Sequence, residues 1–173
     1  MVIILSLLNG SRLYHLNDDE SDYDYLCVDL KPRRDYYLTN GFKKKQTKFF
    51  LDNNVVYDVT YVDFMEFVKS LIKCNPNYLI PMIEKKDMYS TREGQILMMS
   101  SRYFLDYKKI KMAFTGMAES AFNREKDGAM KSKYLAYYRD EMLLNYIPET
   151  METNYHKIKN TVDSILWISD LGI

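Results

Sequence analysis

The chain has 173 residues, of which 47% are hydrophobic and 28% charged, and its 24 basic and 24 acidic residues give a formal net charge of zero. These values indicate one globular domain, or one small domain with a helical appendage. They exclude a chain that is basic overall, although a local basic patch that contacts nucleic acid stays open. The apolar start at residues 2–8 is too short to span a bilayer and lacks signal-peptide features, so we expect a cytoplasmic protein without membrane contact.

The first part of the chain predicts two strands joined by a polar connection. The apolar run at residues 2–8 is expected to be a central strand buried on both faces, and the run at 25–30 a second strand. Between them stand Gly10, Ser11 and a turn of helix at about 12–16. Gly10 would let backbone N–H groups approach a phosphate closely, Ser11 would add a hydroxyl donor, and the helical turn would direct free N–H groups to the same phosphates.

Two carboxylates, Asp22 and Asp24, stand at the start of the second strand. Residues i and i+2 of a strand project from the same face about 7 Å apart, so these side chains are expected to lie together. Two adjacent carboxylates repel each other, and a divalent cation relieves that repulsion. The acidic residues just before them are interpreted as a solvated loop rather than as extra ligands: Asp18, Asp19 and Glu20.

A third candidate carboxylate, Asp58, lies in the strand expected at residues 55–62 and shares a face with Thr60. An aspartate in an apolar strand is costly to bury unless charge or hydrogen bonds compensate, and a shared metal site would supply that compensation. The nearby Asp63 is the alternative candidate for the third carboxylate. Because Asp63 and Glu66 are expected to form a capping box for the following helix, the pattern favours Asp58.

A β-hairpin is predicted around Asn40 and Gly41, with arms at residues 36–39 and 42–50. The second arm contains four lysines: Lys43, Lys44, Lys45 and Lys48. They are interpreted as part of a charged edge strand that resists aggregation, and a basic patch for a triphosphate or a nucleic acid is the alternative.

The rest of the chain is predicted to be mainly helical. Asn75 and Pro76 fit the cap and the first residue of a helix that Pro81 is expected to cut short. Gly116 and Gly128 interrupt the later helical pattern and are expected to mark turns or bends. The helical pattern covers four further segments: residues 96–110, 111–124, 126–146 and 152–168.

Gly10-Ser11, a gap of ten residues and Asp22-x-Asp24 before an apolar strand resemble the signature of the DNA polymerase β-type nucleotidyltransferase superfamily. Within that superfamily the chain is similar to the predicted nucleotidyltransferases of bacteria and phages. Asp58 and the Asn75-Pro76 step match a third carboxylate and an Asn-Pro step of the family. The family tends to carry an acidic residue soon after this step, where the chain has Leu79-Ile80-Pro81.

The resemblance implies an α/β (α+β) fold, with a small mixed β-sheet nucleotidyltransferase core at residues 1–90 and a helical C-terminal region at residues 91–173 packed on it. It implies a catalytic site for Mg²⁺ or Mn²⁺ formed by Asp22, Asp24 and Asp58. It also implies that an NTP such as ATP binds through its triphosphate at Gly10, Ser11 and Arg12. In such enzymes later helices send basic side chains to the triphosphate, and three candidates, for which a solvated helix surface is the alternative, are Lys131, Lys133 and Arg139.

The implied function is transfer of a nucleoside monophosphate from the NTP to a hydroxyl acceptor, with release of pyrophosphate. An RNA or tRNA end is the first candidate acceptor because of the lysines at residues 43–48, and protein and small-molecule hydroxyls stay open. The second hypothesis is a non-catalytic nucleotide-sensing or partner-binding module, such as a toxin–antitoxin component. Only nine residues precede Gly10, so a protein partner would replace the helices that usually pack before this strand. The apolar segment around Trp167 is interpreted as core packing or a partner contact.

Overall fold

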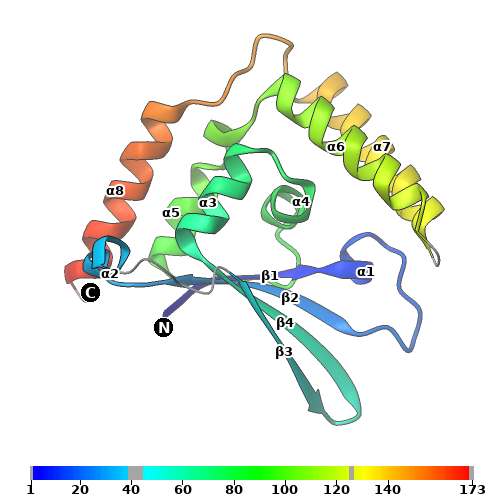
Figure 1. The fold of residues 1–173 in the computed structure, drawn as a ribbon, viewed down its shortest axis with the longest axis horizontal. Coiled ribbons are helices and arrows are strands. Elements are labelled where there is room, and N and C mark those ends of the chain that lie inside the picture. The colour runs from blue at the N-terminus through cyan, green and yellow to red at the C-terminus, as the bar shows by residue number, and fades with distance from the viewer. Residues whose placement is uncertain (1, 39–44, 125–126, 172–173) are drawn as a thin grey trace.

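The computed structural model describes residues 2–38, 45–124 and 127–171, which form a mixed sheet covered by helices (Figure 1). Within these residues the sheet has five strands in the order β3-β4-β2-β1-β5. Strands β2 and β4 are parallel, and the other neighbouring pairs are antiparallel. The strand bounds are β1 Val2–Asn9, β2 Tyr23–Leu30, β3 Lys45–Asp52, β4 Val55–Asp63 and β5 Tyr89–Ser90.

Helices form most of the rest of the described chain. Their bounds are α1 Gly10–Leu13, α2 Arg33–Leu38, α3 Phe64–Ile72, α4 Pro76–Glu84, α5 Arg92–Met99, the 3₁₀ helix η1 Ser101–Phe104, α6 Tyr107–Phe122, α7 Gly128–Asn145 and α8 Tyr155–Leu171. In Figure 1, α3 to α8 lie on one side of the sheet, with α8 at one end and the α6–α7 pair at the other. None of these helices combines the length and apolar content that a membrane span needs. The predicted α+β fold with a helical C-terminal region is confirmed.

One hydrophobic core joins the sheet to the helices. Leu7 and Leu8 of β1 project from opposite faces of the strand and are both buried, which agrees with the prediction of a strand that buries side chains on both faces. Phe67 of α3, Phe114 of α6 and Ile165 of α8 belong to the same buried cluster. The core therefore includes side chains from before and after residue 90, and the domain boundary at that residue stays a prediction.

Two predicted helix starts are confirmed by their caps. Asp63 Oδ1 accepts a hydrogen bond of 3.0 Å from the backbone N–H of Met65 at the start of α3. Asn75 Oδ1 accepts one of 3.1 Å from the N–H of Asn77 at the start of α4. These bonds satisfy backbone donors that have no partner inside the helix.

The prediction that Pro81 ends α4 early is wrong. The helix continues to Glu84 with Pro81 inside it. A proline removes one helical hydrogen bond, but Pro81 and Met82 are both buried. We attribute the longer helix to this apolar burial, which offsets the lost bond.

The prediction of a strand at residues 36–39, as the first arm of a hairpin around Asn40 and Gly41, is also wrong. The described part of that arm belongs to α2, whose Arg33 N–H donates a 3.1 Å hydrogen bond to Asp170 Oδ1 of α8. This tertiary contact holds the segment as a helix against α8. Asn40, Gly41, Lys43 and Lys44 lie outside the described residues.

The observed hairpin is formed by β3 and β4, which pair antiparallel through the turn at Asn53 and Asn54. Both turn residues have positive φ, 49° and 63°. Asparagine tolerates this left-handed conformation, and a two-residue hairpin turn of this kind needs it at both positions. Strand β3 lies at the edge of the sheet and contains Lys48, as the edge-strand interpretation expected.

The predicted helix at residues 96–110 is interrupted. α5 ends at Met99, η1 follows, and Asp106 caps α6 by accepting a 3.0 Å hydrogen bond from the N–H of Lys109. This cap starts a new helix and prevents one continuous run. Gly116 lies inside α6 instead of at a turn, whereas Gly128 begins α7.

Candidate active site

Two of the predicted carboxylates, Asp24 and Asp58, lie directly opposite each other on neighbouring strands. The parallel pairing of β2 with β4 places Asp24 beside Asp58 and Leu26 beside Thr60. Both carboxylates line one cleft, which has a volume of about 370 Å³ and is also lined by residues of α4 and α7. Neighbouring strands are about 4.8 Å apart, so the pairing brings together two side chains of like charge.

The turn at Gly10 holds the Asp24 carboxylate. Gly10 has a φ of +64°, and a Cβ added to it would overlap Asp24 Oδ2. The backbone N–H of Ser11 donates a hydrogen bond to the same carboxylate. The positive φ and the close approach both require glycine at position 10.

The surroundings of Asp24 disfavour its charge. Burial raises the pKa of Asp24 above its usual range, and the negative charges of Asp58 and Asp22 raise it further. The Ser11 hydrogen bond and the Lys131 ammonium act in the opposite direction without cancelling these effects. The positive charge around Asp24 is therefore too small to stabilise its ionised carboxylate fully, and an additional cation bound there would be stabilised by it.

Asp58 supplies a direct test of whether a metal fits. Its Oδ1 atom is buried and has no hydrogen-bond partner among the described residues. An unsatisfied buried carboxylate oxygen is costly, and a metal ligand bond removes that cost. Carboxylate oxygens suit Mg²⁺ and Mn²⁺, and Mg²⁺ is commonly held by one or two carboxylates together with substrate phosphates. The pair Asp24 and Asp58 fits that requirement.

Asp22 lies at the margin of this arrangement. It is exposed, directly precedes β2 and does not line the cleft, although its charge contributes to the raised pKa of Asp24. Across residues 2–38, 45–124 and 127–171, no three His, Cys, Asp or Glu side chains gather closely enough to form a metal site by themselves. The protein alone thus brings together two of the three predicted carboxylates.

Lys131 is the basic candidate that reaches the carboxylates. It lies in α7, lines the cleft with Asp24 and Asp58, and also lines an adjoining cavity of about 190 Å³ with Ser11 and Arg124. Burial lowers the pKa of Lys131, and the charge of Arg124 lowers it further, whereas Asp24 opposes the shift. The two cavities share Gly10, Tyr14 and Lys131, with the carboxylates lining the first cavity and Arg124 lining the second.

The other two basic candidates lie elsewhere. Lys133 is exposed on α7 and lines neither cavity. Arg139 donates hydrogen bonds of 2.7 Å to Thr115 Oγ1 and 2.8 Å to Asp140 Oδ1, and it lines a separate cavity between α6 and α7. The structure does not bring either side chain to Asp24 and Asp58.

Arg12 contacts the loop before β2 instead of the cleft. Its guanidinium donates hydrogen bonds to the carbonyl oxygens of Ser21, at 2.7 Å, and Asp22, at 3.2 Å. It also lies 3.8 Å from the centre of the Tyr23 ring. These contacts occupy the side chain on the side away from Asp58.

Several residues that line the site were not predicted from the sequence as site residues. Asn77 Oδ1 accepts a 3.3 Å hydrogen bond from the Tyr14 hydroxyl, and the Lys131 ammonium lies 4.9 Å from the centre of the Tyr14 ring. Asn75 was predicted as a helix cap and as part of the family's Asn-Pro step, and it also lines the cleft, whereas Arg124 was not singled out. Tyr14 is held near Gly10 by the local chain, since its backbone N–H donates a 3.3 Å hydrogen bond to the Gly10 carbonyl. No local sequence signal marks Arg124, because it follows α6 and only tertiary packing brings it to the cavity that Gly10 lines.

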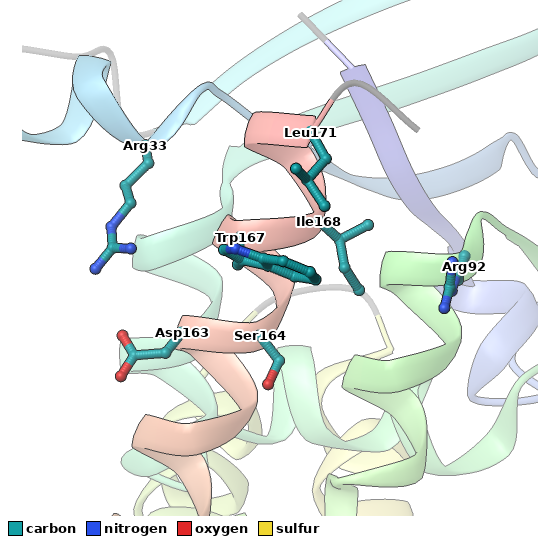
Figure 2. Close-up of a pocket in the computed structure, with 7 residues that line it drawn as sticks. All are labelled: Arg33, Arg92, Asp163, Ser164, Trp167, Ile168 and Leu171. Atoms are coloured by element: carbon teal, nitrogen blue, oxygen red, sulfur yellow. The ribbon is translucent and has the colours of Figure 1, made fainter.

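A larger cavity, of about 770 Å³, lies at the opposite end of the molecule and contains none of the predicted site residues. Figure 2 shows Arg33 of α2 and Arg92 of α5 on either side of Trp167 and Leu171 of α8. Trp167 is 59% exposed, whereas its neighbours Leu166 and Ile168 are buried. The apolar segment of α8 therefore packs in the core on one face and exposes Trp167 on the other.

Comparison with known proteins identifies the family of the chain. A model of the RNA repair pathway DNA polymerase beta family matches residues 1–165. The chain belongs to this family. The predicted polymerase β-type relationship is thereby confirmed, and the family supports a role in nucleotidyl transfer.

One solved structure is similar over 96% of this chain and 68% of its own: a nucleotidyltransferase-like protein from Exiguobacterium sibiricum 255-15, with 11% sequence identity and a TM-score of 0.41. A search of curated proteins gave no match.

Proposed function

We propose that this polymerase β-family protein is a metal-dependent nucleotidyltransferase that transfers a nucleoside monophosphate from an NTP to a hydroxyl group and releases pyrophosphate. One observation carries the proposal: Asp24 and Asp58 stand in register in one cleft that also contains Gly10 and Lys131. Paired carboxylates beside a cationic side chain are what a site for a metal-bound triphosphate requires.

The carboxylates have different proposed roles. Asp24 and Asp22 would hold Mg²⁺ or Mn²⁺, and Asp58, with its unpartnered Oδ1, would help to hold metal and would accept the proton of the attacking hydroxyl. The bound metal supplies positive charge that stabilises the transition state. The hydroxyl oxygen attacks the α-phosphorus, the bond from that phosphorus to the bridging oxygen of the β-phosphate breaks, and pyrophosphate leaves.

The triphosphate is proposed to lie between the carboxylates and α7. Lys131 lines both cavities, Ser11 and Arg124 line the one beyond Gly10, and both cations would face the β- and γ-phosphates. Charge-assisted hydrogen bonds of this kind contribute about 1.5–3 kcal/mol each. A bound triphosphate would also oppose the effect of Arg124 that lowers the Lys131 pKa.

An RNA end is the proposed acceptor. The matching family is described by an RNA repair pathway, which supports RNA over protein or small-molecule hydroxyls. A cation and an aromatic ring, both of which can contact single-stranded nucleic acid, also lie close together on the edge hairpin, with Lys48 5.5 Å from the centre of the Tyr61 ring. Strand alternation places this pair on the face of the sheet opposite Asp58, so it does not border the cleft.

To test this proposal, the protein is incubated with each α-labelled NTP in the presence of Mg²⁺ or Mn²⁺. Either total RNA or lysate protein is added as the acceptor. We expect label on RNA, and Asp24→Asn and Asp58→Asn should each lower transfer by at least about 100-fold. Asp52→Asn, at the exposed end of β3, is the matched control and should transfer normally. Label on protein alone would overturn the RNA acceptor. Absence of transfer with every donor and acceptor would favour the non-catalytic binding module.

A further inference from the structure

Arg12 connects three parts of the chain that surround the carboxylates. Its Nη2 and Nε atoms donate to the carbonyl oxygens of Ser21 and Asp22, which join the loop to β2. Its guanidinium carbon lies 3.8 Å from the centre of the Tyr23 ring. Arg12 belongs to α1 and follows directly after Gly10 and Ser11, so it links the Gly10 turn to the main chain of Asp22.

The contacts of Arg12 extend through the Tyr23 ring to the neighbouring strand β4. Tyr23 stacks on Tyr57 with ring centres 5.5 Å apart and ring planes at 27°. These two tyrosines are opposite each other in the β2–β4 pairing, one position before Asp24 and Asp58. Because strand side chains alternate between faces, the Arg12–Tyr23–Tyr57 stack lies on the face opposite the two carboxylates.

The rest of the loop is fixed independently of Arg12. The Ser21 hydroxyl donates to Asp18 Oδ1 at 2.6 Å, and the N–H groups of Asp18 and Glu20 donate to Ser21 Oγ and Asp18 Oδ1. The loop is therefore a small closed unit, and Arg12 is what attaches its end to α1. Asp18 is therefore held within the loop, whereas Asp22 stands at the end of the loop, directly before β2.

We propose that Arg12 is a positioning residue for Asp22: it fixes the main chain that carries this carboxylate beside Asp24, and it does not bind the triphosphate. The inference rests on the proposed function, in which Asp22 is a metal ligand. Arg12 lines neither the cleft nor the adjoining cavity, and its fork of donors points at two carbonyl oxygens. A lysine would keep the charge but lose the two-point contact and the planar stacking.

The test measures Mn²⁺ binding by the loss of the EPR signal of free Mn²⁺, with and without a non-hydrolysable NTP analogue. We expect Arg12→Lys to weaken Mn²⁺ binding about tenfold, as residues that orient metal ligands typically do. Asp22→Asn should have a similar effect, and the double variant should be no worse than Asp22→Asn alone, because both changes remove the same ligand.

The matched control is Arg102→Lys. Arg102 is an exposed arginine that lies 5.1 Å from the Tyr103 ring centre and donates to its hydroxyl, in η1 outside the cleft. The Arg102→Lys variant should bind Mn²⁺ with the affinity of the wild type. Arg12→Lys with wild-type Mn²⁺ affinity would overturn the inference while leaving the proposed function intact. Wild-type protein that binds no Mn²⁺ under either condition would overturn the proposed function, and the inference with it.

Discussion

The replacement Gly10→Ala tests whether the glycine turn and the Asp24 carboxylate work as one unit. An alanine at a φ of +64° costs about 1–2 kcal/mol because its Cβ approaches the following carbonyl oxygen. The added Cβ would also overlap Asp24 Oδ2, and ordinary contacts begin near 3.4 Å. The carboxylate would have to move by more than about 1 Å, and such a displacement of a reacting group costs about 100-fold in rate.

We therefore expect two separable losses in Gly10→Ala. The melting temperature should fall by about 2–8 °C, which is the strain energy converted for a chain of this size. Nucleotide transfer per folded molecule should fall by about 100-fold, measured as labelled product against the fraction folded at the assay temperature.

Two other glycines supply matched controls. Gly116 lies inside α6, an added Cβ meets nothing within 4 Å, and Gly116→Ala should raise stability by about 0.5–1 kcal/mol without changing transfer. Gly94→Ala would overlap the Ile4 carbonyl away from the cleft, so it should lower stability while folded molecules keep their activity. Full transfer activity in Gly10→Ala would refute the reasoning.

The remaining predictions concern the charges of the site. Because burial and the charges of Asp58 and Asp22 raise the Asp24 pKa in the folded protein, the stability due to Asp24 is fully present below its unfolded pKa and is lost as the pH rises through the raised value. Metal-free Asp24→Asn should therefore melt above the wild type at neutral pH, and a lower melting temperature would contradict this sign. Lys131→Ala should weaken NTP binding by about 10–100-fold, whereas Lys133→Ala, whose side chain is exposed and outside the cleft, should change it less than about twofold in a titration. Saturating NTP and Mg²⁺ at about 100 times the dissociation constant should add about 2.7 kcal/mol, or about 5–11 °C, and EDTA should remove most of that shift.

The carboxylates could be predicted because strand geometry is local. The alternation of side chains along a strand is enough to place Asp58 on the same face as Thr60. The pairing of Asp24 with Asp58 is different, because it depends on the register between two strands about 30 residues apart and on their parallel direction. The family resemblance supplied that step, and the residue pattern alone could not.

The hairpin shows how tertiary contacts decide between two local signals. Asn40-Gly41 and Asn53-Asn54 both favour turns, and the first is the stronger pattern in isolation. The second joins two paired strands, whereas residues 33–38, before the first, form α2 and contact α8 through the Arg33–Asp170 hydrogen bond. Contacts with residues more than 100 positions away are invisible in a window of ten residues.

The basic side of the site could not be located for a similar reason. Lys131 and Lys133 are two residues apart on one helix and differ only in the direction they face. That direction depends on how α7 approaches α6, where a Cβ at Gly128 would overlap the Ala121 carbonyl. Glycine permits this close approach, and the approach turns Lys131 toward Gly10.

Two features of the site destabilise the folded protein, and both indicate the chemistry of the ligand that we propose. Asp24 is held against Gly10 with an unfavourable charge, and Asp58 keeps a buried oxygen without a partner among the described residues. Either could have been replaced by a neutral side chain with a gain in stability. Both costs have the same remedy, which is positive charge placed between two strands, and Lys131 alone does not provide enough of it to restore the ordinary Asp24 pKa. In the proposed function, a divalent cation carrying a triphosphate would satisfy the Asp58 oxygen, lower the Asp24 pKa and give Lys131 and Arg124 an anion to bind, so one ligand would offset both costs.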